Sequence, residues 1–230
     1  MTLNTDLTAA VQTIFQSVWS QRDGTVVPEP ENLRLGNDAV NLQATVLYAD
    51  LAESTALVDG HTAVFAAEVY KSYLHCAAKI IKSQGGSITA YDGDRVMAVY
   101  IGDMKNSRAV KSALMIHYAV LEIINPLLAR QYPKESYRVK QAVGIDTSPI
   151  LASRIGVRND NDLVWVGRAA NYAAKLCGIR SDYPTYITGN VFDVIEDAMK
   201  VTGGKSMWEE RVWTDVNNLR IYRSNWFWRF

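Results

Sequence analysis

Cysteine and histidine are scarce in this sequence, which has two cysteines, Cys76 and Cys177, and three histidines among its 230 residues. So few thiols cannot form the disulfide framework of a small secreted domain, and the scattered histidines offer no zinc signature. We therefore expect a soluble cytoplasmic protein whose thiols are mostly reduced.

An excess of charge of one sign is also missing, because 24 lysines and arginines balance 24 aspartates and glutamates. Proteins that hold nucleic acid or an anionic membrane need a basic surface, so we expect neither as a partner. The longest uncharged apolar stretch, residues 112–121, is about half as long as a membrane span requires. Asp6 and several polar residues lie at helical spacing near the start, which argues against a secretory signal.

What the sequence does have is enough apolar content, 48%, to bury a core. Residues 5–20 place apolar side chains on one face of a predicted helix, and Pro28 and Pro30 then interrupt the chain. We predict an N-terminal helix with its linker over residues 1–41, the linker itself over 22–37, and one main domain over residues 42–230.

The main domain alternates strand-like and helix-like segments. Asp92-Gly93 between two apolar runs is a strong hairpin signal. The predicted order starts with a strand at 44–50, a helix at 53–84 and hairpin strands at 87–91 and 95–100. A helix at 106–131, with Pro126 late in it, and strands at 138–145 and 150–154 follow. The chain then has a short run at 163–166, a helix from Gly167 to near Gly178, and an edge strand or strand pair at 218–230. This order predicts an α+β sandwich with one mixed or antiparallel sheet.

Two acidic residues lie where burial of an acid is costly. Asp50 ends the first strand of the main domain, and Asp94 begins the second strand of the hairpin. If these strands are neighbours, both carboxylates reach the same rim of the sheet, and divalent cations relieve their repulsion. Mg²⁺ or Mn²⁺ favours such a site, together with substrate phosphates. The alternative is that Asp50 merely lies next to a helix cap and Asp94 is an ordinary turn residue.

The segment after Asp50 leads directly into a helix. Backbone N–H groups of Leu51, Ala52, Glu53, Ser54 and Thr55 at that helix start can bind a polyphosphate.

A second group of candidate residues is on the helix after Gly167. Asn171 and Lys175 are four residues apart and share one helical face, with small alanines between them. An amide and a cation on one face suit a ribose or a phosphate. An ordinary solvated helix face is the alternative explanation for these two residues taken alone.

Together these segments resemble the catalytic domain of class III nucleotide cyclases. The matching segments are residues 46–55, 91–99, 143–146 and 166–175, so the resemblance covers about residues 42–187. It implies a class III cyclase-like α/β sandwich, with a central, mostly antiparallel sheet flanked by helices, preceded here by the N-terminal helix. Residues 42–230 would then form the nucleotide cyclase catalytic domain.

The resemblance also implies roles for these residues. Asp50 and Asp94, with the backbone carbonyl of Leu51, would bind two divalent cations, Mn²⁺ or Mg²⁺. The domain would act as a homodimer whose active sites lie at the interface, so that Asn171 and Lys175 reach in from the second subunit. Asn171 would orient the ribose, and Lys175 would stabilise charge on the triphosphate. Relatives usually have arginine at the position of Lys175, so bidentate phosphate contact is replaced by a point charge.

The departures from the family pattern concern the base. Purine cyclases use polar side chains four residues before the hairpin aspartate and seven residues before the asparagine, where this chain has Ala90 and Val164. Neither can form a hydrogen bond through its side chain, so either the base is not a purine or other residues recognise it.

Three large side chains are candidates to line the base pocket. Tyr48 shares strand parity with Asp50 and adds a phenol. Arg95 can donate to a pyrimidine carbonyl, although strand parity turns it away unless the hairpin is twisted. Trp165 can form a wall of the pocket. Each also has a structural alternative: a core aromatic for Tyr48 and Trp165, and a surface cation for Arg95.

The chain is most similar to the standalone pyrimidine cyclases of bacterial anti-phage (Pycsar) systems. That resemblance implies cyclisation of a ribonucleoside triphosphate, UTP more than CTP, to a second messenger that acts on a separately encoded effector. A purine cyclase with an unusual pocket and a catalytically weak, nucleotide-binding cyclase-like regulator are the alternatives. The presence of both Asp50 and Asp94 argues against the regulator.

Overall fold

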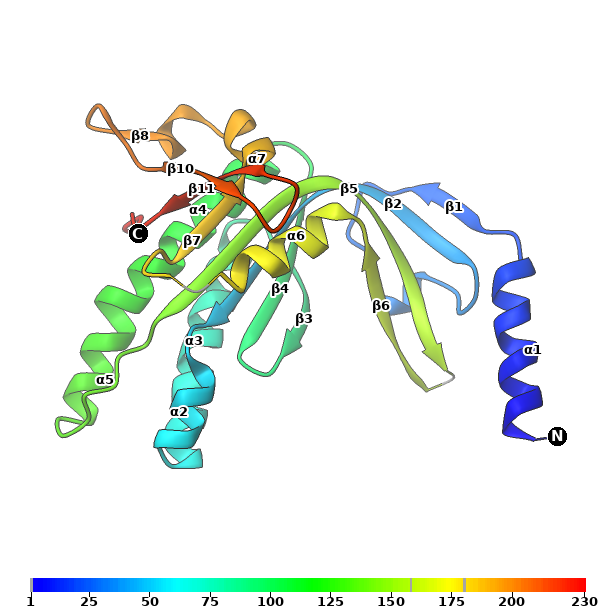
Figure 1. Cartoon of the computed structure of the whole chain (residues 1–230), viewed down its shortest axis with the longest axis horizontal. Coiled ribbons are helices and arrows are strands. Elements are labelled where there is room, and N and C mark those ends of the chain that lie inside the picture. Colours follow the sequence, from blue (N-terminus) through cyan, green and yellow to red (C-terminus); the bar gives the residue numbers. More distant parts are fainter. Residues whose placement is uncertain (1, 158, 180) are drawn as a thin grey trace.

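The computed structural model describes residues 2–157, 159–179 and 181–230, and within these residues nine strands form one sheet (Figure 1). Its two longest strands, β2 (Asp38–Leu51) and β5 (Gln141–Val157), pair antiparallel from Ala39 to Leu51. The order across the sheet is β10-β11-β7-β5-β2-β4-β3, with β1 beside β2 and β6 beside β5. The other strands are β1 (Ser20–Asp23), β3 (Ser87–Asp92), β4 (Arg95–Ile101), β6 (Asp160–Val166), β7 (Thr185–Thr188), β10 (Glu209–Trp213) and β11 (Leu219–Ser224).

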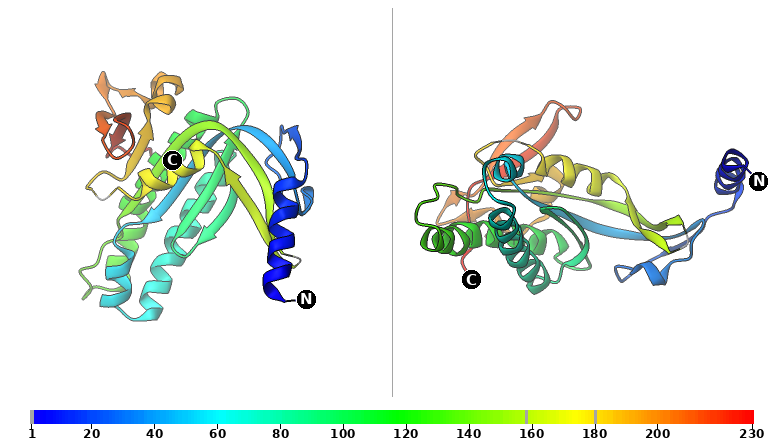
Figure 2. Two further views of the ribbon diagram at one scale, coloured as in Figure 1. Left: turned by 45° about the vertical axis from the view of Figure 1, so that its right-hand side comes forward. Right: turned by 90° about the horizontal axis from the view of Figure 1, so that it is seen from below.

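Most of these pairings are antiparallel, and only the β1–β2 and β5–β7 pairings within the described sheet are parallel. Helices α3 (Ala63–Ser83) and α4 (Lys105–Ala119) cover one face, and α6 (Arg168–Cys177) covers the other (Figure 2). The predicted fold class, a mostly antiparallel sheet flanked by helices, is therefore confirmed.

The core has two main parts because side chains alternate along β2. Leu47 and Ala49 pack with α3 and α4 in the larger cluster, whereas Val46 and Tyr48 lie on the α6 side. On that second side the helix approaches the sheet closely, because α6 presents alanines to it.

The first predicted long helix is wrong as a single element. It is divided into α2 (Ser54–Gly60) and α3, which begins at Ala63. His61 has an extended backbone, and the Thr62 hydroxyl accepts a hydrogen bond from the Phe65 N–H at 3.3 Å as a new N-cap. A cap residue inside the predicted helix thus starts a second helix.

The two strands predicted at 138–145 and 150–154 are also wrong, because β5 is continuous. Pro149 is tolerated in it because β7 pairs with Val143–Ile145 and β6 pairs with Leu151–Val157, which leaves one edge open at the proline.

The second long helix is interrupted near Pro126, as the sequence predicts. A π-helical segment (Val120–Ile124) joins α4 to α5 (Asn125–Gln131). The helical run Lys105–Gln131 is, among the described residues, long and apolar enough to cross a membrane by length and composition, but 50% of its apolar window is buried inside the fold.

The predicted N-terminal helix is present as α1 (Leu3–Gln16), which has no buried residue and lies at the far end of the molecule from α4 (Figures 1 and 2). The predicted linker is not structureless, since β1 pairs with β2 and Pro30–Asn32 form a 3₁₀ turn. The expected boundary after residue 41 falls inside β2, and the division into two parts remains a prediction.

The remaining elements lie between β7 and β10 in the chain, outside the main sheet. They are α7 (Gly189–Val194), the 3₁₀ turn Asp197–Met199 and the small hairpin of β8 (Val201–Thr202) and β9 (Lys205–Ser206). The expected C-terminal strand pair is β10–β11, although it begins nine residues earlier than predicted, at Glu209 rather than at 218.

The C-terminal residues after β11 lie along α4. The Trp228 N–H donates to the Leu114 carbonyl at 3.0 Å, and the His117 Nδ1 lies 2.9 Å from the Trp226 carbonyl oxygen. Burial lowers the pKa of His117, and this hydrogen bond only partly opposes the shift.

We expect acidification to destabilise the protein through His117. Because its pKa is lower in the folded state, the unfolded chain binds its proton first, so stability falls as the pH drops below about 6.5. Urea unfolding at pH 7.5 and 5.5 measures this effect. Between these two pH values the free energy of unfolding should fall less for His117→Gln than for the wild type. Equal losses would contradict this assignment.

Candidate active site

The two acidic candidates lie at the same end of adjacent strands. The β2–β4 pairing runs from Ala44 opposite Ile101 to Ala49 opposite Val96. Asp50 therefore follows at the end of β2 beside the position where Asp94 enters β4. The Asp92-Gly93 turn that joins β3 to β4 is the predicted hairpin, with Gly93 at φ +60°.

Strand pleating alone would turn the two carboxylates to different faces. Asp50 has the parity of Tyr48 on the α6 side, whereas Asp94 has the parity of Val96 on the α3 side. Asp94 lies in the turn before β4, however, and Asp50 is next to the end of β2, so both belong to the open rim.

A buried phenol on α3 lies within electrostatic range of both acids. Burial raises the pKa of Tyr73 well above its ordinary value, and the charges of Asp50 and Asp94 raise it further. No sequence signal marks Tyr73, because a tyrosine at a core position of a helix has no distinguishing spacing.

Three buried polar atoms around this rim have no hydrogen-bond partner within the described chain: Asp94 Oδ2, Tyr137 OH and Gln141 Nε2. Burial, followed by the charges of Glu53, Tyr70 and Asp94, raises the pKa of Tyr137 to about 12, so its hydroxyl is neutral. A buried carboxylate oxygen without a donor is costly unless a cation binds it. The residues present therefore fit a divalent cation.

The donor set is small. Among the described residues no three His, Cys, Asp or Glu side chains group closely enough to hold a metal ion. Two carboxylates with remaining positions for water and phosphate oxygens correspond to the ligand set of Mg²⁺ or Mn²⁺ rather than to a closed structural site.

The predicted phosphate-binding segment forms a sharp turn. Glu53 has left-handed backbone angles (φ 63°, ψ 29°) and is the N-cap of α2 without a side-chain cap. Its carboxylate lies 3.3 Å from Lys140 Nζ, so the side chain is turned toward the residue that precedes β5. The Ala52 N–H donates to the Lys140 carbonyl at 3.0 Å, so the backbone groups of Glu53, Ser54 and Thr55 remain the candidates to bind phosphate.

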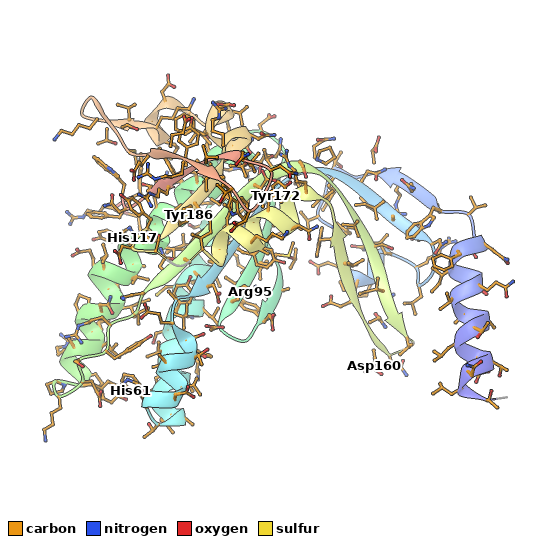
Figure 3. All side chains as sticks on the ribbon, viewed as in Figure 1. His61, Arg95, His117, Asp160, Tyr172 and Tyr186 are labelled. Carbon is orange, nitrogen blue, oxygen red and sulfur yellow. The ribbon has the colours of Figure 1, made fainter. Side chains whose placement is uncertain are left out.

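Arg95 and Tyr48 lie together. The guanidinium carbon of Arg95 lies 5.2 Å from the centre of the Tyr48 ring, and Arg95 Nη2 lies 2.9 Å from Asp92 Oδ2. The pleat of β4 therefore turns Arg95 away from Asp94 and toward Tyr48 and Asp50. No extra twist of the hairpin is needed to bring Arg95 to this side. Figure 3 shows Arg95 on the hairpin below α6.

The surroundings of Tyr48 are otherwise apolar. Ala90 and Tyr48 both pack against the α6-side cluster, which includes Trp165. The Trp165 Nε1 atom is buried and has no hydrogen-bond partner within the described residues. Val164 has the opposite parity on β6 and does not belong to that cluster.

Asn171 and Lys175 are exposed on the outer face of α6, while Ala169, Ala170 and Ala173 pack against the sheet. Their side chains point away from the core of their own chain. This arrangement does not bring them into contact with Asp50 and Asp94 of the same chain.

No family model matches the chain, but curated relatives do. A uridylate cyclase from Xanthomonas perforans is 50% identical over 100% of this chain and 99% of its own length. A uridylate cyclase from Burkholderia cepacia is 47% identical over 99% of both chains.

Solved structures show the same fold at low sequence identity. The adenylyl cyclase CyaB from P. aeruginosa superposes with a TM-score of 0.68 at 20% identity, covering 81% of this chain and 95% of its own. The guanylyl cyclase Cya2 gives a TM-score of 0.69 at 18% identity, covering 82% and 94%. With relatives at such identity over their full length and the class III cyclase fold, this chain belongs to the uridylate cyclase family.

Proposed function

We propose that this enzyme converts UTP to 3′,5′-cyclic UMP and pyrophosphate, with Asp50 and Asp94 holding two divalent cations, Mn²⁺ or Mg²⁺. The observation that carries the metal site is the buried Asp94 Oδ2 atom without a hydrogen-bond donor, at the same rim as Asp50. The bound ions would lower the pKa of the ribose 3′-hydroxyl and neutralise charge on the departing pyrophosphate. CTP is the second candidate substrate.

The chain's own residues would position the substrate. Backbone N–H groups of residues 53–55 would bind the triphosphate, and the carbonyl of Leu51 would add a metal ligand. The 3′-hydroxyl oxygen attacks the α-phosphorus in line, the bond to the pyrophosphate oxygen breaks, and the hydroxyl proton leaves to solvent. No covalent bond to the protein is needed.

Class III cyclases are dimeric, and we propose a homodimer with two active sites at its interface. The outward orientation of Asn171 and Lys175 supports this arrangement, because it leaves both side chains available to a neighbouring subunit. Asn171 would orient the ribose, and Lys175 would place a point charge near the triphosphate.

Base recognition is proposed for Tyr48 and Arg95. Arg95 donates to a pyrimidine carbonyl, and the Tyr48 hydroxyl adds a donor or acceptor, while Ala90 leaves the purine-reading position empty. Two carbonyl groups distinguish uracil from cytosine, which has one, so a guanidinium donor favours UTP. A purine cyclase with an unusual pocket remains the alternative enzyme.

In the cell, we propose that the enzyme lies in the cytoplasm and makes an anti-phage second messenger that acts on a separate effector protein. The relatives named uridylate cyclase support a cyclic nucleotide as the messenger. A catalytically weak nucleotide-binding regulator is the alternative from another class, and the retained pair of acids argues against it.

Incubation of the protein with each of the four ribonucleoside triphosphates and Mn²⁺, followed by identification of the product, tests this function. Cyclic UMP as the main product is the expected result. Cyclic AMP or cyclic GMP as the main product would refute the pyrimidine assignment, and no cyclic product from any substrate would favour the regulator.

Tyr48→Phe should weaken discrimination among the four triphosphates. One lost hydrogen bond is worth about 0.5–1.5 kcal/mol, or about a two- to twelvefold change in relative kcat/KM. Tyr91→Phe, on the exposed part of the β3–β4 hairpin, is the matched control and should leave the ratios unchanged. An unaltered selectivity profile in Tyr48→Phe would remove Tyr48 from base recognition.

A further inference from the structure

Asp146 is a charged residue buried deep in the fold, at 0% exposure in the middle of β5. Burial raises its pKa, and hydrogen bonds from the Thr188 hydroxyl and the Thr147 N–H, with the charge of Arg168, oppose that shift. Burial of a carboxylate there costs desolvation free energy, so the groups that contact Asp146 indicate which part of the fold it stabilises.

Its main partner is Arg168, the first residue of α6. Arg168 Nε lies 3.1 Å from Asp146 Oδ2, and Nη2 lies 3.4 Å from Oδ1. The same Nη2 donates to the Thr147 carbonyl at 2.7 Å. With its amide oxygen turned toward Arg168, Asn190 of α7 accepts from both Nη atoms at 3.2 and 2.8 Å. One guanidinium therefore joins the start of α6 to β5 and α7.

The first turn of α6 has little else to fix its orientation. The inward residues of its first two turns, Ala169, Ala170 and Ala173, have side chains too short to interdigitate deeply with the sheet, whereas the larger buried residues Leu176 and Cys177 lie at the other end of the helix. The helix lies so close to β5 that a Cβ at Gly144 would be 2.1 Å from the Ala173 carbonyl oxygen. Within the described residues, the Ser148 hydroxyl adds a polar anchor at this end by accepting from the Ala169 N–H at 2.9 Å.

Arg168, Asn171 and Lys175 follow one another at spacings of three and four, so they lie along one stripe of α6. A rotation of the helix about its axis would move both outward side chains together. We propose that Arg168, held by Asp146, is a positioning residue that fixes α6 so that Asn171 and Lys175 meet the substrate bound by the second subunit. This inference rests on the proposed function.

In this arrangement Arg168 and Lys175 belong to the same half of a shared site. Each interface site combines the metal-binding half of one chain with the α6 half of the other. An Arg168→Lys chain retains a sound metal-binding half, so it should complement an Asp50→Asn chain, whose α6 is intact. It should not complement a Lys175→Ala chain, because both chains then lack a working α6 half.

Arg168→Lys keeps the charge beside Asp146 but loses the planar fork. We expect kcat of this homodimer to fall by about 10- to 100-fold while KM changes by less than about twofold, since misplacement affects the transition state most. In mixture with Asp50→Asn, half of the dimers are mixed and each has one intact site, which gives about a quarter of wild-type activity. Asp146→Asn should behave in the same way with a smaller loss.

Arg223→Lys is the matched control, because Arg223 forms a comparable ion pair with Glu209 at 2.8 Å on β11, away from α6. It should keep full activity. Full activity of Arg168→Lys, its recovery with Lys175→Ala, or no recovery with Asp50→Asn would each overturn the proposal. An inactive wild type would instead refute the proposed function, and a chain that completes a mixed site is necessarily folded.

Discussion

Replacement of Asp94 by asparagine is expected to abolish cyclic nucleotide formation while the protein stays folded. The change keeps the shape of the side chain but removes half of the carboxylate charge that would hold the cations. A loss of several kcal/mol of transition-state stabilisation corresponds to at least about a 1,000-fold fall in kcat. Product formation from UTP with Mn²⁺ measures it directly.

The same variant should not be less stable than the wild type without added metal. Its Oδ2 atom has no donor to lose, and neutralisation removes repulsion from Asp50. Mn²⁺ should raise the thermal unfolding midpoint of the wild type by binding the native state, and that rise should be absent in Asp94→Asn.

Asp103→Asn is the control, since Asp103 is exposed just beyond the opposite end of β4. It should show wild-type activity and a wild-type response to Mn²⁺. More than about a tenth of wild-type activity in Asp94→Asn would show that the rim does not hold the catalytic cations.

Mixing two inactive chains should restore activity if the sites are shared. Asp50→Asn lacks the metal-binding half and Lys175→Ala lacks the α6 half, so each homodimer should retain less than about 1% of wild-type turnover. Their mixed dimer has one complete site, and free exchange of subunits should give about a quarter of wild-type activity.

The matched control for mixing combines Asp50→Asn with Asp94→Asn, because both changes lie in the same half and no mixed dimer has a complete site. Activity should stay at the level of the homodimers. Failure of the Asp50→Asn and Lys175→Ala mixture, after subunit exchange is verified by size or tag, would contradict the shared-site arrangement.

Local sequence signals predicted much of this candidate site. The Asp92-Gly93 turn and the apolar runs beside it fix the hairpin, and strand alternation places Asp50 near the end of a strand. These features depend on residues within a few positions of one another, so a short window of sequence contains them. Asn171 and Lys175 follow in the same way from helical spacing.

Other features depend on contacts between distant residues. The helix break at Thr62, the continuity of β5 through Pro149 and the β1–β2 pairing depend on caps, open edges and partners elsewhere in the chain. Tyr73, Tyr137 and Gln141 join the rim only because α3 and the start of β5 pack beside it. No periodicity marks such residues.

Turn chemistry and hydrophobic period are local properties, so neighbouring residues in the chain were enough to predict the class of the fold, the hairpin and the two acidic residues. The packing of Arg95 on Tyr48, the burial of one Asp94 oxygen without a donor, and the ion pair of Asp146 at the start of α6 became visible in the folded chain. Burial and hydrogen-bond satisfaction are properties of the whole packed chain, and they exist only after distant segments have come together.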